Sequence, residues 1–202
     1  MSDIKNIEQH YSLDERPFLE KVRGFCQLVD DRYSPYLTDF LNPREIQIVE
    51  ELAHYYNLKF FVSSTPESEE YGRVILAPEY YELDDEDFEI KRLEISYARQ
   101  FNKLTHPKVL GALINQLGLD RQVFGDIILD EEGRVQFSIA SHLASYAIMT
   151  ITKIGNVSVT LKEVSKDDWI SNQENYSQSF VLLSSMRLDN VLATVLNLSR
   201  SN

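Results

Sequence analysis

The four histidines, His10, His54, His106 and His142, are the side chains in this sequence best suited to acid–base or metal chemistry. Catalysis of that kind needs an imidazole, carboxylate or activated nucleophile to converge with a partner in one pocket. No two histidines have the HxH or HExxH spacing that places two ligands on one metal ion, and no CxxC motif is present. We therefore predict no catalytic residues, no metal site and no cofactor.

Three other features could in principle carry chemistry. The carboxylate run 82–89, ELDDEDFE, could attract a divalent cation, but no glycine is placed to fold it into a ligand cage, and we interpret it as an acidic linker. Gly111, Gly118 and Gly125 are spaced at seven residues on and just after one predicted helix, which does not make the tight backbone cradle that a phosphate group requires. Cys26 lies in an apolar helical pattern, which is typical of a small core residue.

Charge is distributed unevenly along the 202 residues. Residues 1–88 carry 8 Lys+Arg and 20 Asp+Glu, which gives 8 − 20 = −12, whereas residues 89–202 carry 12 of each, which gives zero. All the excess acid thus lies in the first part, and the second part can present a basic face to nucleic acid. No apolar run is long enough for a membrane span and no secretory signal is visible, so we expect a cytoplasmic protein.

The fold class predicted from the pattern is α+β. Residues 4–31 carry a helical apolar stripe, and Asn42, Pro43 and Glu45 form a capping-box start for the next helix. Strands are predicted at 59–63 and 73–77. We interpret residues 1–80 as a small N-terminal α/β domain, followed by the acidic linker at 81–89.

Residues 90–164 have the order β, α, β, β, α, β. The helices are predicted at 106–117, with Thr105 as N-cap and Gly118 as the end, and from Ser141 to about Ile154. This order is that of the ferredoxin-like fold, which RNA-recognition modules share, with both helices on one face of an antiparallel sheet and the other face free. The aromatic-rich strand of those modules is absent, so the order predicts the fold but not RNA binding.

The connector 165–185 precedes a short C-terminal segment, residues 186–202. Trp169 is predicted to anchor the connector on the sheet, with stacking on a nucleic-acid base as the alternative. In the last segment, RLDNVLA followed by LSRS resembles the opening of the S-four RNA-binding domain. Because only the first part of that module is present, we expect the sequence to stop inside it; an ordinary amphipathic helix is the alternative.

A wider resemblance covers nearly the whole chain. The stretches HPKVLGALINQLGLDRQVFGDIIL, at 106–129, and GRVQFSIASHLASY, at 133–146, are similar to the RNA-binding region of the YlmH family. FLNPREIQIVEELA and RVILAPEYY upstream, and VSVTLKEV and SSMRLDNVLATVLNLSRSN downstream, follow in that family's order.

The resemblance implies a non-catalytic protein that binds RNA of the large ribosomal subunit and tRNA, in quality control of stalled peptidyl-tRNA. It also implies RNA contacts for residues that match the family pattern. These are Arg187 and Arg200 in the S-four opening, and His106, Lys108 and Arg121 in the middle region. For Arg121 an ordinary surface charge is an equal alternative.

Two other functions stay open. The older family label of cell-division protein, together with the acidic first part, is consistent with a cell-division-associated interaction protein that docks a basic partner. An RNA-modifying enzyme is less favoured, because pseudouridine synthases carry their S-four module ahead of a large catalytic domain. The oligomeric state is not predicted from the sequence.

Overall fold

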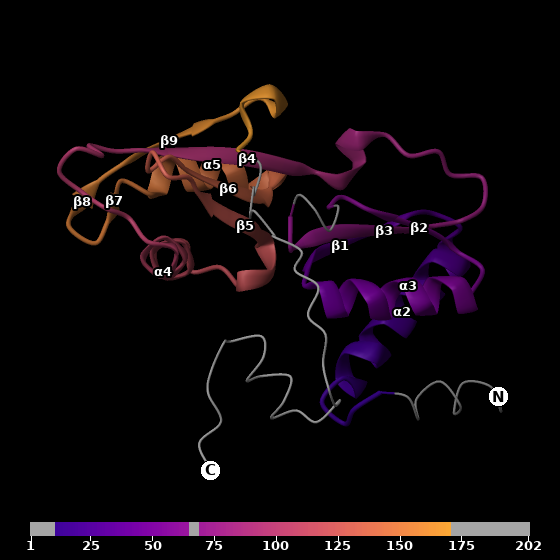
Figure 1. The fold of residues 1–202 in the computed structure, drawn as a ribbon. Coiled ribbons are helices and arrows are strands. Elements are labelled where there is room, and N and C mark those ends of the chain that lie inside the picture. The colour runs from indigo at the N-terminus through magenta and orange to yellow at the C-terminus, as the bar shows by residue number, and fades with distance from the viewer. Residues whose placement is uncertain (1–10, 65–68, 171–202) are drawn as a thin grey trace, which may run out of the picture. The chain divides into compact units, whose positions relative to one another are not determined.

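A computed structural model of the chain describes residues 11–64 and 69–170. It combines helices with antiparallel sheets, in agreement with the mixed fold class predicted (Figure 1). The α-helices of these residues are α2 (Arg16–Arg32), α3 (Pro43–Tyr55), α4 (His106–Leu117) and α5 (Ser141–Thr150). Short 3-10 turns lie at η1 (Asp85–Phe88), η2 (Arg121–Val123) and η3 (Lys166–Asp168). The strands are β1 (Tyr36–Leu41), β2 (Lys59–Val62), β3 (Gly72–Ala77), β4 (Ile90–Ser96), β5 (Phe124–Leu129), β6 (Val135–Ala140), β7 (Lys153–Ile154), β8 (Val157–Ser158) and β9 (Thr160–Glu163).

The first sheet has the order β1-β3-β2, with antiparallel neighbours. Helices α2 and α3 cover one of its faces (Figure 1), where Val22, Val49, Val74 and Leu76 belong to one buried cluster. Cys26 lies in this core, fully buried, and burial raises the pKa of its thiol to about 11. The prediction of a core cysteine is therefore confirmed.

The start of α3 follows the predicted capping box. The Asn42 side chain accepts a hydrogen bond from the Glu45 backbone N–H, and the Glu45 side chain accepts one from the Asn42 N–H, each at 2.9 Å. Pro43 occupies the first turn. These side chains satisfy two backbone donors that the helix itself leaves free.

The second sheet has the order β5-β6-β4-β9, again with antiparallel neighbours. With the separate β7–β8 hairpin set aside, β4, α4, β5, β6, α5 and β9 follow the β-α-β-β-α-β order expected for residues 90–164, which is that of a split βαβ sheet. Helices α4 and α5 share one face, because Val109 and Ala147 lie in the same buried cluster as Leu93 and Phe137.

Several details differ from the sequence prediction. Strand β1 was not predicted. Helix α5 ends at Thr150 rather than near Ile154, because Lys153–Ile154 turn into a hairpin with β8 in which Gly155 has φ +59°. Neither Ser141 nor Thr105 makes a side-chain capping hydrogen bond. The linker is also partly ordered, since η1 buries Phe88 against Ile75.

The two sheets make direct contact. Gly125 of β5 lies against the ring of Phe40 of β1, and a Cβ at this glycine would be 2.7 Å from Phe40 Cε1 and 2.9 Å from Ser138 Cβ. Asp126 accepts hydrogen bonds from the backbone N–H groups of Glu70 and Tyr71. A glycine is required at 125 by this close approach rather than by its backbone angles.

The capping box gives a first prediction. Asn42→Ala should lower the free energy of unfolding by about 1 kcal/mol, because the Glu45 N–H loses its acceptor. Thr105→Ala is the matched control, since Thr105 is also an N-cap but makes no capping bond. Urea unfolding followed by circular dichroism measures both. Equal losses in the two variants would show that the capping hydrogen bond does not stabilise α3.

The sheet contact gives a second prediction. Gly125→Ala should destabilise the protein by roughly 1–3 kcal/mol through overpacking against Phe40. Gly24→Ala, in the interior of α2 where a new Cβ meets nothing within 4 Å, should instead stabilise it by roughly 0.5–1 kcal/mol. Thermal unfolding of both variants tests this pair. A neutral Gly125→Ala variant would contradict the close contact.

Candidate nucleic-acid interface

The residues predicted to contact RNA fall in three places. His106 and Lys108 lie in the first turn of α4 and are exposed. Arg121 lies beyond the other end of this helix, which at 12 residues is about 18 Å long, and is half-buried. Arg187 and Arg200 lie outside the described residues. The structure thus brings His106 and Lys108 together and separates them from Arg121.

Arg121 is engaged within the protein. Its guanidinium lies 4.2 Å from the centre of the Tyr71 ring, donates a hydrogen bond to the Phe124 carbonyl, and is one of the charges that act on Asp126. Burial raises the pKa of Asp126, and the hydrogen bonds from Tyr71 and Glu70 and the charges of Arg121 and Arg92 oppose that rise. Arg121 therefore joins η2 to the segment before β3.

Residues 95–119 contain no Asp or Glu, although the whole chain has 32 of them. The cations of this stretch are Arg99, Lys103 and Lys108, with His106 between the two lysines. Phe101 stands in the same stretch with 83% of its surface exposed, more than any other large hydrophobic residue among those described. Sequence reasoning missed Phe101 and Lys103, although the acid-free run could have indicated them.

The face of the second sheet that lies opposite α4 and α5 is polar. We call it the polar face and define it by Arg92, Glu94, Gln136 and Ser138, where Arg92 pairs with Ser138 and Glu94 with Gln136 across β4 and β6. All four are buried, and Gln136 is fully inaccessible. The prediction that this face is free is therefore wrong.

The polar face is covered by residues 164–170, here called the strap. The Gln136 side chain donates to the Asp168 carbonyl at 3.0 Å and accepts from the Ile170 N–H at 2.9 Å. The Arg92 guanidinium lies 3.8 Å from the centre of the Trp169 ring, a cation–π contact. Trp169 anchors the connector on the sheet, as predicted.

Glu69, from the segment before β3, also contacts the polar face. It forms an ion pair with Arg92 and accepts a hydrogen bond from the Ser138 hydroxyl at 3.3 Å. Burial lowers the pKa of Arg92 to about 10, and the charge of Asp126 opposes this. Because arginine remains protonated at neutral pH even so, the guanidinium is a buried cation whose partners come from within the chain.

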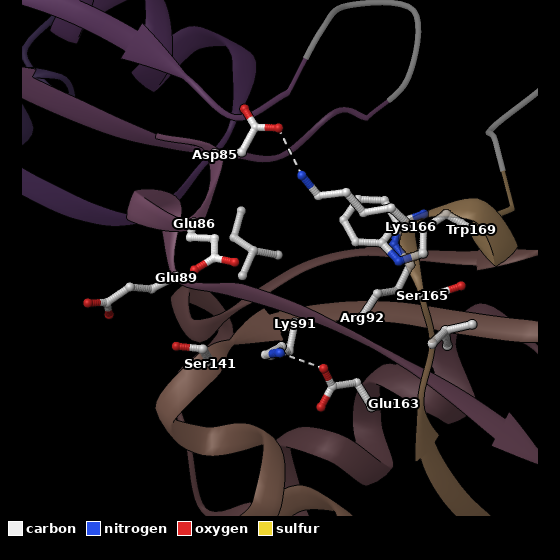
Figure 2. A pocket seen from close by; sticks show the side chains of 12 residues that line it. Asp85, Glu86, Glu89, Lys91, Arg92, Ser141, Glu163, Ser165, Lys166 and Trp169 are labelled. Carbon is white, nitrogen blue, oxygen red and sulfur yellow. Dashed lines mark hydrogen bonds and ion pairs between the residues drawn. The ribbon is translucent and has the colours of Figure 1, made fainter. Parts of the chain in front are cut away.

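A pocket of about 370 Å³ lies beside the strap, between η1, β4 and β9 (Figure 2). Its walls carry both signs of charge. Lys166 pairs with Asp85 at 2.8 Å, and Lys91 pairs with Glu163 at 2.5 Å. Each pairing raises the pKa of its lysine. Since these cations are already neutralised by neighbouring carboxylates, the pocket is a poor site for phosphate.

No group of three or more His, Cys, Asp or Glu side chains is placed to hold a metal ion within residues 11–64 and 69–170. In the same part of the chain, no helix combines the length and apolar character needed to cross a membrane.

Comparison with known proteins gives concordant results. Residues 84–168 match the family described as "Putative RNA-binding domain in YlmH". The ribosome-associated protein quality control protein P2 of Bacillus subtilis (strain 168) is 32% identical over 197 residues, which cover 98% of this chain and 76% of that protein. The solved structure of the cell division protein ylmH from Streptococcus pneumoniae is 40% identical, with a TM-score of 0.71, and the match covers 80% of this chain and 98% of that one.

The family model spans the second sheet and its helices, and the similarity to the Bacillus protein extends over almost the whole length of the chain. The resemblance noted in the sequence is thereby confirmed: this chain belongs to the YlmH family.

Proposed function

We propose that this protein is a non-catalytic, cytoplasmic RNA-binding protein that associates with the large ribosomal subunit and with tRNA in quality control of stalled peptidyl-tRNA. The observation that carries the proposal is the 32% identity, over 98% of the chain, to a ribosome-associated quality control protein. The match of residues 84–168 to an RNA-binding domain supports it.

The charge pattern also supports RNA as the partner. An acidic chain with a net charge of −12 is repelled by phosphate as a whole, so a contact with RNA requires a local surface without carboxylates. Residues 95–119 provide such a stretch, and the predicted contacts His106 and Lys108 are exposed within it. Arg187 and Arg200 remain proposed contacts in the S-four opening.

A second candidate function is supported by the name of the Streptococcus relative, a cell division protein. In that case the acidic residues 1–88 would dock a basic partner at the division site. A fluorescent fusion distinguishes the two functions in cells. Enrichment at mid-cell that persists when ribosome binding is abolished would favour the division role, and a ribosome-like distribution would favour the first proposal.

Loss of a specific uridine isomerisation in a deletion strain would instead indicate an RNA-modifying enzyme.

The first test is co-sedimentation with large ribosomal subunits at increasing salt. Arg187→Ala combined with Arg200→Ala should weaken binding and lower the slope of log K against log[salt], by roughly 0.7–0.9 for each phosphate that the variant no longer neutralises. The matched control is Arg16→Ala with Arg32→Ala, two exposed arginines at the ends of α2 in the acidic part of the chain. Equal effects in the two double variants would contradict these RNA sites.

The second test separates the two roles of Arg121. Arg121→Ala should lower the free energy of unfolding by about 1–2 kcal/mol, because the Tyr71 ring and the Phe124 carbonyl lose their cationic partner. Lys108→Ala, at an exposed site, should leave stability within about 0.5 kcal/mol. Urea unfolding measures both. An Arg121→Ala variant that is fully stable but binds ribosomes weakly would assign Arg121 to RNA rather than to the sheet junction.

A further inference from the structure

The polar face of the second sheet is already occupied by other residues of the chain. On the polar face, Arg92 and Gln136 already bind Trp169, Asp168 and Ile170. The four residues that define this face include no aromatic side chain, and the strap's Trp169 already has a guanidinium at 3.8 Å. Stacking of bases on this face is therefore blocked by the chain itself.

The loop from β4 to α4, residues 97–105, is exposed in part and is held in place by contacts at both ends. The Ala98 carbonyl accepts hydrogen bonds from the Phe101 backbone N–H and from the Asn102 side chain, each at 3.2 Å. At the far end of the loop Leu104 is buried in the core of the second sheet. Phe101 and Lys103 lie between these two anchors with their side chains in solvent.

The exposed side chains of residues 101–108 include two kinds that act together on single-stranded nucleic acid. Phe101 provides a ring on which a base can stack, and Lys103 and Lys108 provide charges for the flanking phosphates. Neither lysine has a carboxylate partner among the described residues, in contrast to Lys91 and Lys166. His106 lies between them at the start of α4.

We propose that the segment Phe101–Lys108 binds an unpaired stretch of RNA, with one base stacked on Phe101 and phosphates at Lys103 and Lys108. This rests on the proposed function and adds the binding segment, the stacking residue and the class of RNA. An unpaired strand is favoured over a duplex, because the base faces of a duplex are covered by their neighbours.

The test uses the full 202-residue chain and a fluorescein-labelled oligouridylate of about twelve nucleotides, with binding measured by fluorescence anisotropy. Phe101→Ala should weaken binding roughly ten-fold, which is the loss of one stacked base, and Phe101→Trp should restore it. An RNA duplex of the same length should bind more weakly than the oligouridylate.

The charges are tested by salt dependence. Lys103→Ala with Lys108→Ala should lower the slope of log K against log[salt] by about 1.4, as expected for two phosphates of a single strand. Lys91→Ala with Lys162→Ala removes the same charge from exposed sites on β4 and β9 and should leave the slope unchanged.

Three results would overturn the proposal: unchanged binding by Phe101→Ala, tighter binding of the duplex, or equal binding of polyglutamate, which would point to an acidic protein partner.

Co-sedimentation of the same variants with ribosomes separates this failure from that of the proposed function. Wild-type protein that sediments with ribosomes while Phe101→Ala binds oligouridylate normally would refute only the stacking site. If wild-type protein does not sediment with ribosomes and Phe101→Ala binds oligouridylate more weakly than wild type, only the ribosomal role would be refuted.

Discussion

The buried guanidinium of Arg73 holds the first sheet against the segment that leads into β4. Arg73, in β3, donates hydrogen bonds to the carbonyl groups of Thr38 in β1, of Phe88 in η1 and of Glu89 just before β4. Burial lowers its pKa, and the charges of Glu89 and Asp39 oppose the shift. A buried charge is tolerated only when its donors are satisfied, so these carbonyls must stay in place. The Glu89 carbonyl also accepts from the Ser141 N–H, which ties the start of α5 to the same point.

Much of the fold could be predicted because it depends on local chemistry. The capping box at Asn42 and the helix end at Gly118 are each set by residues within a few positions of each other. Strand β1 could not be predicted in this way. Its buried Thr38 is satisfied by the Val74 N–H, 36 residues further along the chain. The end of α5 differs from the prediction because Ile151 and Ile154 continue the helical spacing, although Ile151 caps the helix and Ile154 is buried in the β7–β8 hairpin.

The site shows the same division between local and distant causes. The exposure of His106 and Lys108 follows from their position in the first turn of a surface helix. The role of Arg121 does not follow from its local position, because its partner Tyr71 is 50 residues earlier in the chain. The alternation of polar and apolar residues in β4 and β6 correctly indicates two different sheet faces. The alternation cannot indicate that the polar face is covered by residues from two distant segments, the strap and Glu69.

Two of the contacts that hold the strap constrain its sequence differently. Gln136 binds backbone groups of Asp168 and Ile170, which every amino acid except proline can supply at the donor position, so these two hydrogen bonds do not restrict the side chains there. The length of the strap is restricted, because the number of residues between the end of β9 and Trp169 determines whether the Trp169 ring reaches Arg92. Homologous straps are therefore expected to conserve length and the tryptophan more strongly than composition. An insertion after Ile170 would leave this anchorage intact, whereas one inside the strap would move the ring off the guanidinium.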